Sequence, residues 1–285
     1  MHSPAPGPPR WRLRSRVLEL DHPLVMGVLN VTPDSFSDGG LFLAADAAVD
    51  RGHELIREGA DLVDVGGEST RPGSEGVDAA TEMERVLPVI SRLARAGAVL
   101  SIDTAKAEVA AAAVESGAEV INDVSAGSDP EMLGVMAATG AGVILLHMQG
   151  TPRTMQDDPR YDDVVEEVTT YLVDRAEMAR AAGVDPGSIV IDPGIGFGKT
   201  LDHNLELLRG LGRLVATGYP VMVGASRKGF LGRITGEDDP RARDVATAAA
   251  TALAVAAGAS VVRVHDVAGS RQAAAVAAAV ARVRT

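Results

Sequence analysis

The sequence predicts a single-domain α/β protein of the (β/α)8 TIM barrel type. The chain has 285 residues, of which 46% are hydrophobic, so it can bury a large core. Helix-like segments repeatedly end at a glycine, and a short apolar, β-branched run follows each of them. This alternation indicates a parallel sheet covered by helices on its outside. Eight such units over residues 21–285 match the barrel in number and length. An open doubly wound sheet is the alternative, because periodicity does not show closure.

The eight expected strands follow in order along the chain. The first is PLVMGVLN at 23–30, before the first helix. The others are DLVDV (61–65), AVLSID (98–103), EVIND (119–123), GVILLH (142–147), SIVID (188–192), PVMVGAS (220–226) and SVVRVH (260–265). A glycine stands at the expected end of each preceding helix: Gly59, Gly97, Gly117, Gly140, Gly183, Gly218 and Gly258. Glycine there tolerates the left-handed conformation that closes a helix.

Residues 1–20 are predicted to be a proline-rich, loosely ordered tail that precedes the barrel of residues 21–285. The start, MHSPAPGPPRWRLRSR, is basic and lacks the apolar segment of a secretory signal. The most apolar long stretch, at 245–262, is mostly alanine interrupted by polar residues. It predicts a buried helix and then a strand, not a membrane span. We therefore expect a cytoplasmic protein.

Charge and cysteine content exclude several kinds of partner and site. The chain has 27 Lys and Arg against 39 Asp and Glu, a formal net charge of −12. This excess repels phosphate backbones and anionic lipid, so neither nucleic acid nor a membrane is expected as a partner. The absence of cysteine excludes disulfides, thiolate zinc sites and a cysteine nucleophile. An anionic ligand would need a local cluster of cations.

Polar side chains gather where the expected strands end. They are Asn30, Asp64, Asp103, Asn122, Asp123, His147, Asp192, Ser226, Arg263, His265 and Asp266. In a barrel these ends lie on one face, where such enzymes build their active sites. Two of the residues also have an ordinary structural interpretation: Asp103 as the cap of the following helix, and His147 as a satisfied core histidine. Burying the whole set together is costly unless a ligand uses it.

Cations lie at the same strand ends of this acidic chain. They are Arg71, Lys199, Arg227, Lys228 and Arg263. Their grouping indicates that the ligand carries an anionic group. Asp103, Asn122 and Asp192 offer acceptors for adjacent N–H donors, such as the edge of a 2-amino-4-oxo pyrimidine ring. The expected ligand is a heterocycle with donors at one end and negative charge at the other.

The stretch DPGIGFGKT at 192–200 is similar to a nucleotide-binding loop but does not match one. A P-loop has a glycine, four residues, and then Gly-Lys-Ser/Thr. The position required for the first glycine holds Pro193, and Gly194 leaves too short a spacing. We interpret Asp192 as a ligand-reading residue, with glycines that let the loop run close beneath the ligand. Lys199 either belongs to that site or is a surface residue at the start of a helix.

Seven ordered motifs of the chain resemble those of the dihydropteroate synthase family. They are MGVLNVTPDSFSDGG (26–40), DVGGESTRPG (64–73), SIDT (101–104), INDVS (121–125), DPGIGFGKT (192–200), GASRKGFLG (224–232) and RVHD (263–266). The resemblance covers nearly the whole chain after about residue 20, and every motif is intact. It implies a transferase of folate biosynthesis that condenses 6-hydroxymethyl-7,8-dihydropterin pyrophosphate with p-aminobenzoate. The products would be 7,8-dihydropteroate and pyrophosphate.

The resemblance also implies subsites, a Mg²⁺ ion and a homodimer. It assigns the pterin pocket to Asp103, Asn122, Met148, Asp192, Lys228 and Arg263. It assigns the pyrophosphate to Asn30, Thr70, Arg71, Arg263 and His265, with Asn30 as the magnesium ligand. It assigns p-aminobenzoate to Phe36, Pro72, Phe197 and Ser226. The implied catalytic residues are Asp103, Lys228, Arg263 and the loop carboxylates Asp34 and Asp38. The Ala-rich helix at 273–281 is a candidate dimer surface. The alternative is that it packs on the barrel.

In the implied mechanism pyrophosphate leaves first, and the aniline nitrogen then attacks the pterin-methyl cation. Neutralising the departing charge is the main demand, and no strong base is expected. Two alternatives are a methyltetrahydrofolate-type methyltransferase and a catalytically silent pterin-binding paralogue. The first would share the pterin pocket but has no use for a pyrophosphate site. The second would bind a pterin without turning it over.

Overall fold

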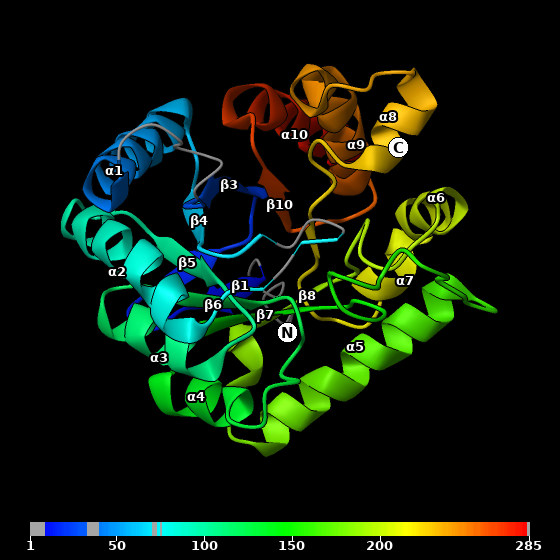
Figure 1. The fold of residues 1–285 in the computed structure, drawn as a ribbon. Coiled ribbons are helices and arrows are strands. Elements are labelled where there is room, and N and C mark those ends of the chain that lie inside the picture. The colour runs from blue at the N-terminus through cyan, green and yellow to red at the C-terminus, as the bar shows by residue number, and fades with distance from the viewer. Residues whose placement is uncertain (1–8, 33–39, 70–72, 75, 284–285) are drawn as a thin grey trace, which may run out of the picture.

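The computed structural model describes residues 9–32, 40–69, 73–74 and 76–283. An eight-stranded parallel sheet forms its centre, and helices surround the sheet (Figure 1). The strands lie in the order β8 (Ile189–Asp192), β7 (Gly142–Leu146), β6 (Val120–Asp123), β5 (Leu100–Asp103), β4 (Leu62–Gly66), β3 (Leu24–Asn30), β10 (Val261–Val264) and β9 (Met222–Val223). The predicted (β/α)8 architecture is confirmed.

The barrel closes between β8 and the short strand β9. A parallel bridge joins Ile191 to Val221, and the N–H of Ile191 donates to the carbonyl of Pro220 at 3.0 Å. The open-sheet alternative is therefore wrong. Only Met222 and Val223 of the expected strand at 220–226 have strand geometry, so the ladder is thinnest at this junction.

The covering helices follow the strands in chain order. They are α1 (Gly40–Glu58), α2 (Ala79–Arg95), α3 (Ala107–Glu115), α4 (Met132–Thr139), α5 (Val164–Ala181), α6 (Leu201–Arg209), α7 (Leu211–Val215), α8 (Gly229–Thr235), α9 (Asp244–Ala256) and α10 (Val267–Ala281), with the 3-10 turns η2 (Pro186–Ser188) and η3 (Pro240–Arg243). Asp78, Asp163 and Asp266 begin three of them by accepting N–H bonds of the first turn. Within the described ranges, no helix combines the length and apolarity that a membrane crossing needs.

Strand register places four polar or small residues in one row at the carboxyl end of the barrel. Asn30 pairs with Gly66, Gly66 with Asp103, and Asp103 with Asn122. A side-chain carbon at Gly66 would lie 3.6 Å from Oδ2 of Asp103 and 3.8 Å from Oδ1 of Asn30. Glycine therefore leaves room between these two polar groups.

The other end of the barrel is closed by a β-hairpin of β1 (Arg10–Arg12) and β2 (Val17–Glu19). Trp11 is fully buried against inward-facing strand residues, and its indole N–H donates to the carbonyl of Ser188 at 2.8 Å. The carboxylate of Glu119 accepts from Ser15 and pairs with Arg16 at 2.6 Å. The prediction of a loosely ordered tail is therefore wrong for residues 9–20, because apolar side chains there fill the open end of the barrel. Residues 1–8 lie outside the described part of the chain.

Candidate active site

Four acidic or amide side chains lie at the carboxyl end of the barrel, three on neighbouring strands and one beyond β7. Asp64 comes from β4, Asp103 from β5, Asn122 from β6 and Asp192 from β8. All four are buried, with Asp103 the most exposed at 8%. Charged and amide groups are rarely so buried without partners or a ligand. The expected gathering of Asp103, Asn122 and Asp192 at one face of the barrel is confirmed.

Arg263 of β10 crosses the barrel and joins two of these carboxylates. Its Nε donates to Oδ2 of Asp64 at 2.6 Å, and its Nη2 donates to Oδ2 of Asp103 at 2.6 Å. The interpretation of Asp103 as a helix cap is wrong, since α3 begins after Lys106 without a side-chain cap. Asp103 is instead part of the site.

Asp64 is the central acceptor of this network. The same Oδ2 atom that binds Arg263 also accepts from Nδ2 of Asn122 at 2.9 Å. Asp64 thus orients two side chains with predicted roles, although Asp64 itself was predicted only to lie at the same face of the barrel. The available signal was a carboxylate in the middle of the apolar run DLVDV.

Several buried acceptors at the mouth of the barrel are unused. Oδ1 of Asp64, Oδ1 of Asp103 and Oδ1 of Asn122 have no hydrogen-bond partner among the residues that the structure describes. Leaving such an atom unpaired costs about 1–3 kcal/mol each. A ligand that carries several N–H donors on one edge would satisfy them, which fits the heterocycle predicted from the sequence.

Asp192 and Lys228 face the same space from the opposite side. Oδ1 of Asp192 accepts the N–H of Gly194 at 2.7 Å. The amine of Lys228 donates to the carbonyl of Ile195 and lies 4.3 Å from the centroid of the Phe197 ring, within cation–π range. Phe197 also packs in an apolar cluster with Leu146 and Met155, against which Met148 lies. The structure thus places the predicted residues Met148, Asp192, Phe197 and Lys228 along one wall.

Burial shifts the pKa values of two of these groups toward neutral pH. It raises the pKa of Asp103 to about 7, an effect that Arg263 opposes and Asp64 reinforces. Burial lowers the pKa of Lys228 to about 7, although the nearby carboxylate of Asp192 opposes that change. Burial also raises the pKa of Asp192. Because Asp103 and Lys228 both have a pKa of about 7, the net charge of the site changes with pH near neutrality.

Lys199 is buried, and its amine contacts residues of the loops after β7 and β8. Its amine donates to Nδ1 of His147 at 2.9 Å, to the carbonyl of Phe197 at 2.9 Å and to the carbonyl of His147 at 3.3 Å. The interpretation of Lys199 as a surface residue is therefore wrong. Gly194 in the same loop also has a packing role that was not predicted. A side chain at Gly194 would overlap the carbonyl oxygen of His147, so the loop lies against the backbone of its neighbour.

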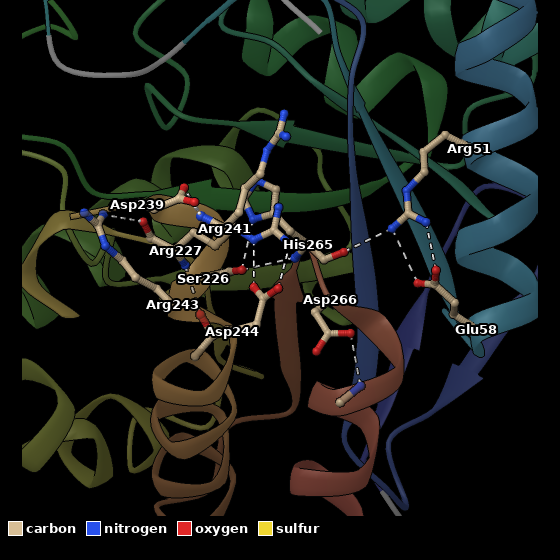
Figure 2. Close-up of polar contacts among 12 residues, drawn as sticks. Arg51, Glu58, Ser226, Arg227, Asp239, Arg241, Arg243, Asp244, His265 and Asp266 are labelled. Atoms are coloured by element: carbon tan, nitrogen blue, oxygen red, sulfur yellow. Dashed lines mark hydrogen bonds and ion pairs between the residues drawn. The ribbon is translucent and has the colours of Figure 1, made fainter. Parts of the chain in front are cut away.

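Ser226 and His265 contact each other beside the predicted cation cluster (Figure 2). The hydroxyl of Ser226 lies 2.9 Å from Nδ1 of His265 and accepts the N–H of His265 at 3.1 Å. Arg227 points away from the pocket into a two-pronged ion pair with Asp244, at 2.7 and 2.8 Å. Among the predicted cations that the structure describes, Lys228 and Arg263 line the mouth. The amine of Lys199 is bound by His147 and the carbonyl of Phe197, and Arg227 is bound by Asp244.

Asn30 is half-buried at the end of β3, across Gly66 from Asp103. No cluster of three or more His, Cys, Asp or Glu side chains able to hold a metal ion occurs in the described residues. The described side chains therefore fit a magnesium ion only as a partner of an anionic substrate, since Mg²⁺ commonly takes few protein ligands and completes its shell with phosphates and water.

Six predicted site residues lie outside the described residues. They are Asp34, Phe36, Asp38, Thr70, Arg71 and Pro72. Beside the last three, Glu68 is held by Lys106 at 2.5 Å, and Lys106 also binds the buried carboxylate of Glu82 at 2.6 Å. This ion-pair cluster was not predicted from the sequence, because it joins the loop after β4 and helix α2 to the loop after β5.

Comparison with known proteins identifies the family of this chain over most of its length. Residues 26–265 match the family described as pterin binding enzymes. The dihydropteroate synthase of Mycobacterium leprae is 51% identical over 253 residues, which cover 86% of this chain and 89% of that protein. The Xanthomonas albilineans dihydropteroate synthase with 4-aminobenzoic acid superposes with a TM-score of 0.91 and 48% identity, over 97% of this chain and 100% of that one. Its structure in complex with 7,8-dihydropteroate gives a TM-score of 0.87 and 45% identity, with the same coverage.

Proposed function

This chain belongs to the family of pterin-binding enzymes, and from that premise we propose how the mouth of its barrel performs the dihydropteroate synthase reaction. The reaction joins 6-hydroxymethyl-7,8-dihydropterin pyrophosphate to p-aminobenzoate and releases pyrophosphate. One observation carries the assignment of the site. Three unpaired buried acceptors, on Asp64, Asp103 and Asn122, lie beside two cations at the carboxyl end of the barrel.

The pterin ring lies among the acceptors at the base of the mouth. Asp103 and Asn122 accept from the N–H donors of its pyrimidine edge, and Asp192 accepts from the same edge across the pocket. Met148 and Phe197 supply an apolar wall. Arg263 lies against the ring, because its hydrogen bonds to Asp64 and Asp103 fix the direction of its guanidinium. Lys228 contributes the charge that faces Asp192.

The pyrophosphate occupies the outer part of the mouth, near Asn30, Arg263 and His265, with Thr70 and Arg71 as predicted further contacts. Burial opposes the charge on Arg263, but Asp64 and Asp103 outweigh it and raise the pKa of Arg263. Its positive charge is therefore permanent. When bound, Mg²⁺ would be held by Asn30 and the substrate, and would neutralise charge on the leaving group.

Catalysis depends on separating charge as the C–O bond to pyrophosphate breaks. Arg263 and His265 stabilise the departing oxygen. Asp103, once ionised, faces the pterin-methyl cation that remains, and Asp34 and Asp38 are predicted to assist it. The aniline nitrogen of p-aminobenzoate then forms the new C–N bond and releases a proton to solvent or pyrophosphate. The lone pair of that nitrogen is free at neutral pH, so no strong base is required.

The p-aminobenzoate lies above the pterin, where Ser226 and Phe197 face the same side of the mouth. The hydroxyl of Ser226 is already oriented by His265, at 2.9 Å. Phe36 and Pro72 are the other predicted contacts. Ser226 supplies a polar contact and Phe197 an aromatic one, which suits a ring with a carboxylate at one end.

Homodimer formation through α9 and α10 is a further part of the proposal. Leu253 of α9 is 66% exposed, and Val276 and Val280 of α10 are 66% and 69% exposed. Large exposed apolar side chains on neighbouring helices are typical of an interface. Light scattering during gel filtration tests this, with Leu253→Glu expected to shift the mass toward the monomer. The cytoplasmic location stays a prediction, which cell fractionation would check.

The proposed reaction is tested by pyrophosphate release from the pterin substrate with Mg²⁺, with and without p-aminobenzoate. Release that requires p-aminobenzoate and yields dihydropteroate is expected. Tight pterin binding without release would contradict the proposal and indicate a silent paralogue. Methyl transfer from methyltetrahydrofolate would indicate the methyltransferase alternative.

A further inference from the structure

The turn after β9 carries an unusual backbone conformation between two site residues. Arg227 has a φ of +58°, in the left-handed region that non-glycine residues seldom occupy. Ser226 precedes it and Lys228 follows it, so the conformation of Arg227 sets the directions of both. A non-glycine residue in this region is strained and persists only where its surroundings enforce it.

Three contacts hold Arg227 in this conformation, and all come from η3 and α9 (Figure 2). The carboxylate of Asp244 binds its guanidinium at 2.7 and 2.8 Å. The hydroxyl of Thr247 accepts its backbone N–H at 3.0 Å, and the guanidinium of Arg243 donates to its carbonyl at 3.1 Å. Arg243 is itself fixed by the carbonyls of Glu237 and Asp238. The turn is therefore anchored at its side chain, its donor and its acceptor.

Two nitrogens of the Arg227 guanidinium are engaged by this anchoring. Its Nε and Nη2 atoms both face Asp244, and the ion pair raises its pKa, mainly through the hydrogen bond to that carboxylate. A two-pronged pair of this kind fixes direction as well as distance. The two side chains are each about a quarter to a third exposed, so water screens the pair only in part.

We propose that Asp244 is a positioning residue for the reaction, acting through Arg227 to aim Ser226 at p-aminobenzoate and Lys228 at the pterin. This inference rests on the proposed function, because it assigns a role within the same site. It also implies that Arg227 does not bind the anionic end of the substrate. Rigid support for a substrate-binding group is worth large factors in rate, since small displacements of such a group weaken its contacts.

The test compares Asp244→Asn, Asp244→Glu and the wild-type protein in steady-state kinetics. Asp244→Asn loses the ion pair, and we expect KM for p-aminobenzoate to rise about tenfold, with a smaller change in kcat. Asp244→Glu keeps the charge and is expected to recover most of the loss. Calorimetry of pterin substrate binding is expected to show about threefold weaker affinity for Asp244→Asn, reporting on Lys228 without turnover.

A matched control separates positioning from stability. Glu119→Gln breaks another partly buried ion pair, Arg16–Glu119, at the opposite end of the barrel. It is expected to lower the thermal midpoint without changing either KM. Unchanged KM and pterin affinity in Asp244→Asn, or the same kinetic changes in Glu119→Gln, would overturn the proposal.

Arg227 offers a second test that does not depend on Asp244. Glycine adopts a positive φ freely, whereas alanine resists it. If the role of Arg227 is conformational, Arg227→Gly will retain a higher kcat/KM than Arg227→Ala. Equal losses in the two variants would mean that the guanidinium itself contacts substrate, and would refute the proposal. Failure of the wild-type protein to release pyrophosphate would refute the proposed function alone, since pterin affinity still reports on Asp244.

Discussion

The amine of Lys199 lies 2.9 Å from Nδ1 of His147, and this contact joins the loops that follow β7 and β8. Burial, aided by the charge of Lys199, lowers the pKa of His147 to about 3. The ring is therefore neutral, and its Nδ1 accepts a hydrogen bond from the amine. With the carbonyls of His147 and Phe197, the amine has three acceptors within hydrogen-bond distance, and burial lowers its pKa well below the ordinary value.

Lys199→Met is expected to destabilise the protein by about 1–3 kcal/mol, because it leaves buried acceptors unpaired. The side chain is of similar length, so packing changes little. Urea unfolding measures the effect. Arg209→Met on the exposed face of α6 is the control, expected to lie within about 0.5 kcal/mol of wild type. Equal effects in the two variants would contradict a bridging role for Lys199.

His147 is expected to make the protein sensitive to acid. Its folded pKa of about 3 lies below the ordinary 6.5, so the unfolded chain takes up a proton first as the pH falls. The stability that the neutral ring contributes is complete above pH 6.5 and is lost progressively toward pH 3. His147→Gln, which keeps an acceptor for Lys199, should flatten this loss. Unfolding free energies at pH 7 and pH 5 measure it, and equal slopes in the two proteins would refute it.

Asp103 is expected to make stability depend on pH in the direction opposite to His147. Its folded pKa of about 7 lies above the ordinary 3.8, so the folded protein holds the proton longer. Stability from this group is greatest below pH 3.8 and falls as the pH rises to 7. Asp103→Asn should lessen this fall while it abolishes most of the activity. The comparison of wild type with the variant at each pH cancels the contribution of His147. An unchanged pH slope would mean that Asp103 is ionised in the unliganded protein.

Gly194→Ala should destabilise the loop after β8 more than its backbone angle alone explains. Gly194 and Gly140 have nearly the same φ, +64° and +63°. A side chain at Gly194 would overlap the carbonyl of His147, whereas one at Gly140 has no heavy-atom neighbour within 4 Å in the described structure. We expect about 1 kcal/mol of destabilisation for Gly140→Ala and at least about 2 kcal/mol more for Gly194→Ala. Equal values in chemical denaturation would argue against the close packing of the two loops.

Trp11→Ala is expected to cost about 3–5 kcal/mol in unfolding free energy, since it opens a cavity at the closed end of the barrel. Arg10→Ala, on the exposed face of the same strand, is the control. Activity per folded molecule should be unchanged, because the hairpin lies at the end of the barrel opposite the site. A stability similar to that of the control would show that residues 9–20 are dispensable, as the sequence alone suggested.

The fold was predictable because its signals are local. Each strand is an apolar run after a helix-ending glycine, and the last residue of several runs is polar. Asp103, Asn122 and Asp192 could therefore be placed at one face before any contact was known. The same reasoning led to the wrong ends for some strands, since Ser226 belongs to a turn although it follows an apolar run.

The parts that could not be predicted depend on partners far along the chain. Asp64 binds Arg263 across 199 residues, and Trp11 binds the carbonyl of Ser188 across 177. Nothing in the composition of either segment specifies its partner. Arg227 is different, since Asp244 is only 17 residues away. There the sequence shows a cation at a strand end but not the direction of its side chain.

Because strand β9 has only two residues, the junction between β8 and β9 has fewer backbone hydrogen bonds than the junctions of the longer strands. Amide hydrogens of Val221 to Val223 are expected to exchange with solvent faster than those of β3 and β4, because local opening needs few bonds to break there. Asp192 and Lys228 lie on opposite sides of this β8–β9 junction. A pterin bound to both residues would link β8 to β9. Amide exchange along β9 would then become slower as more of the sites are occupied.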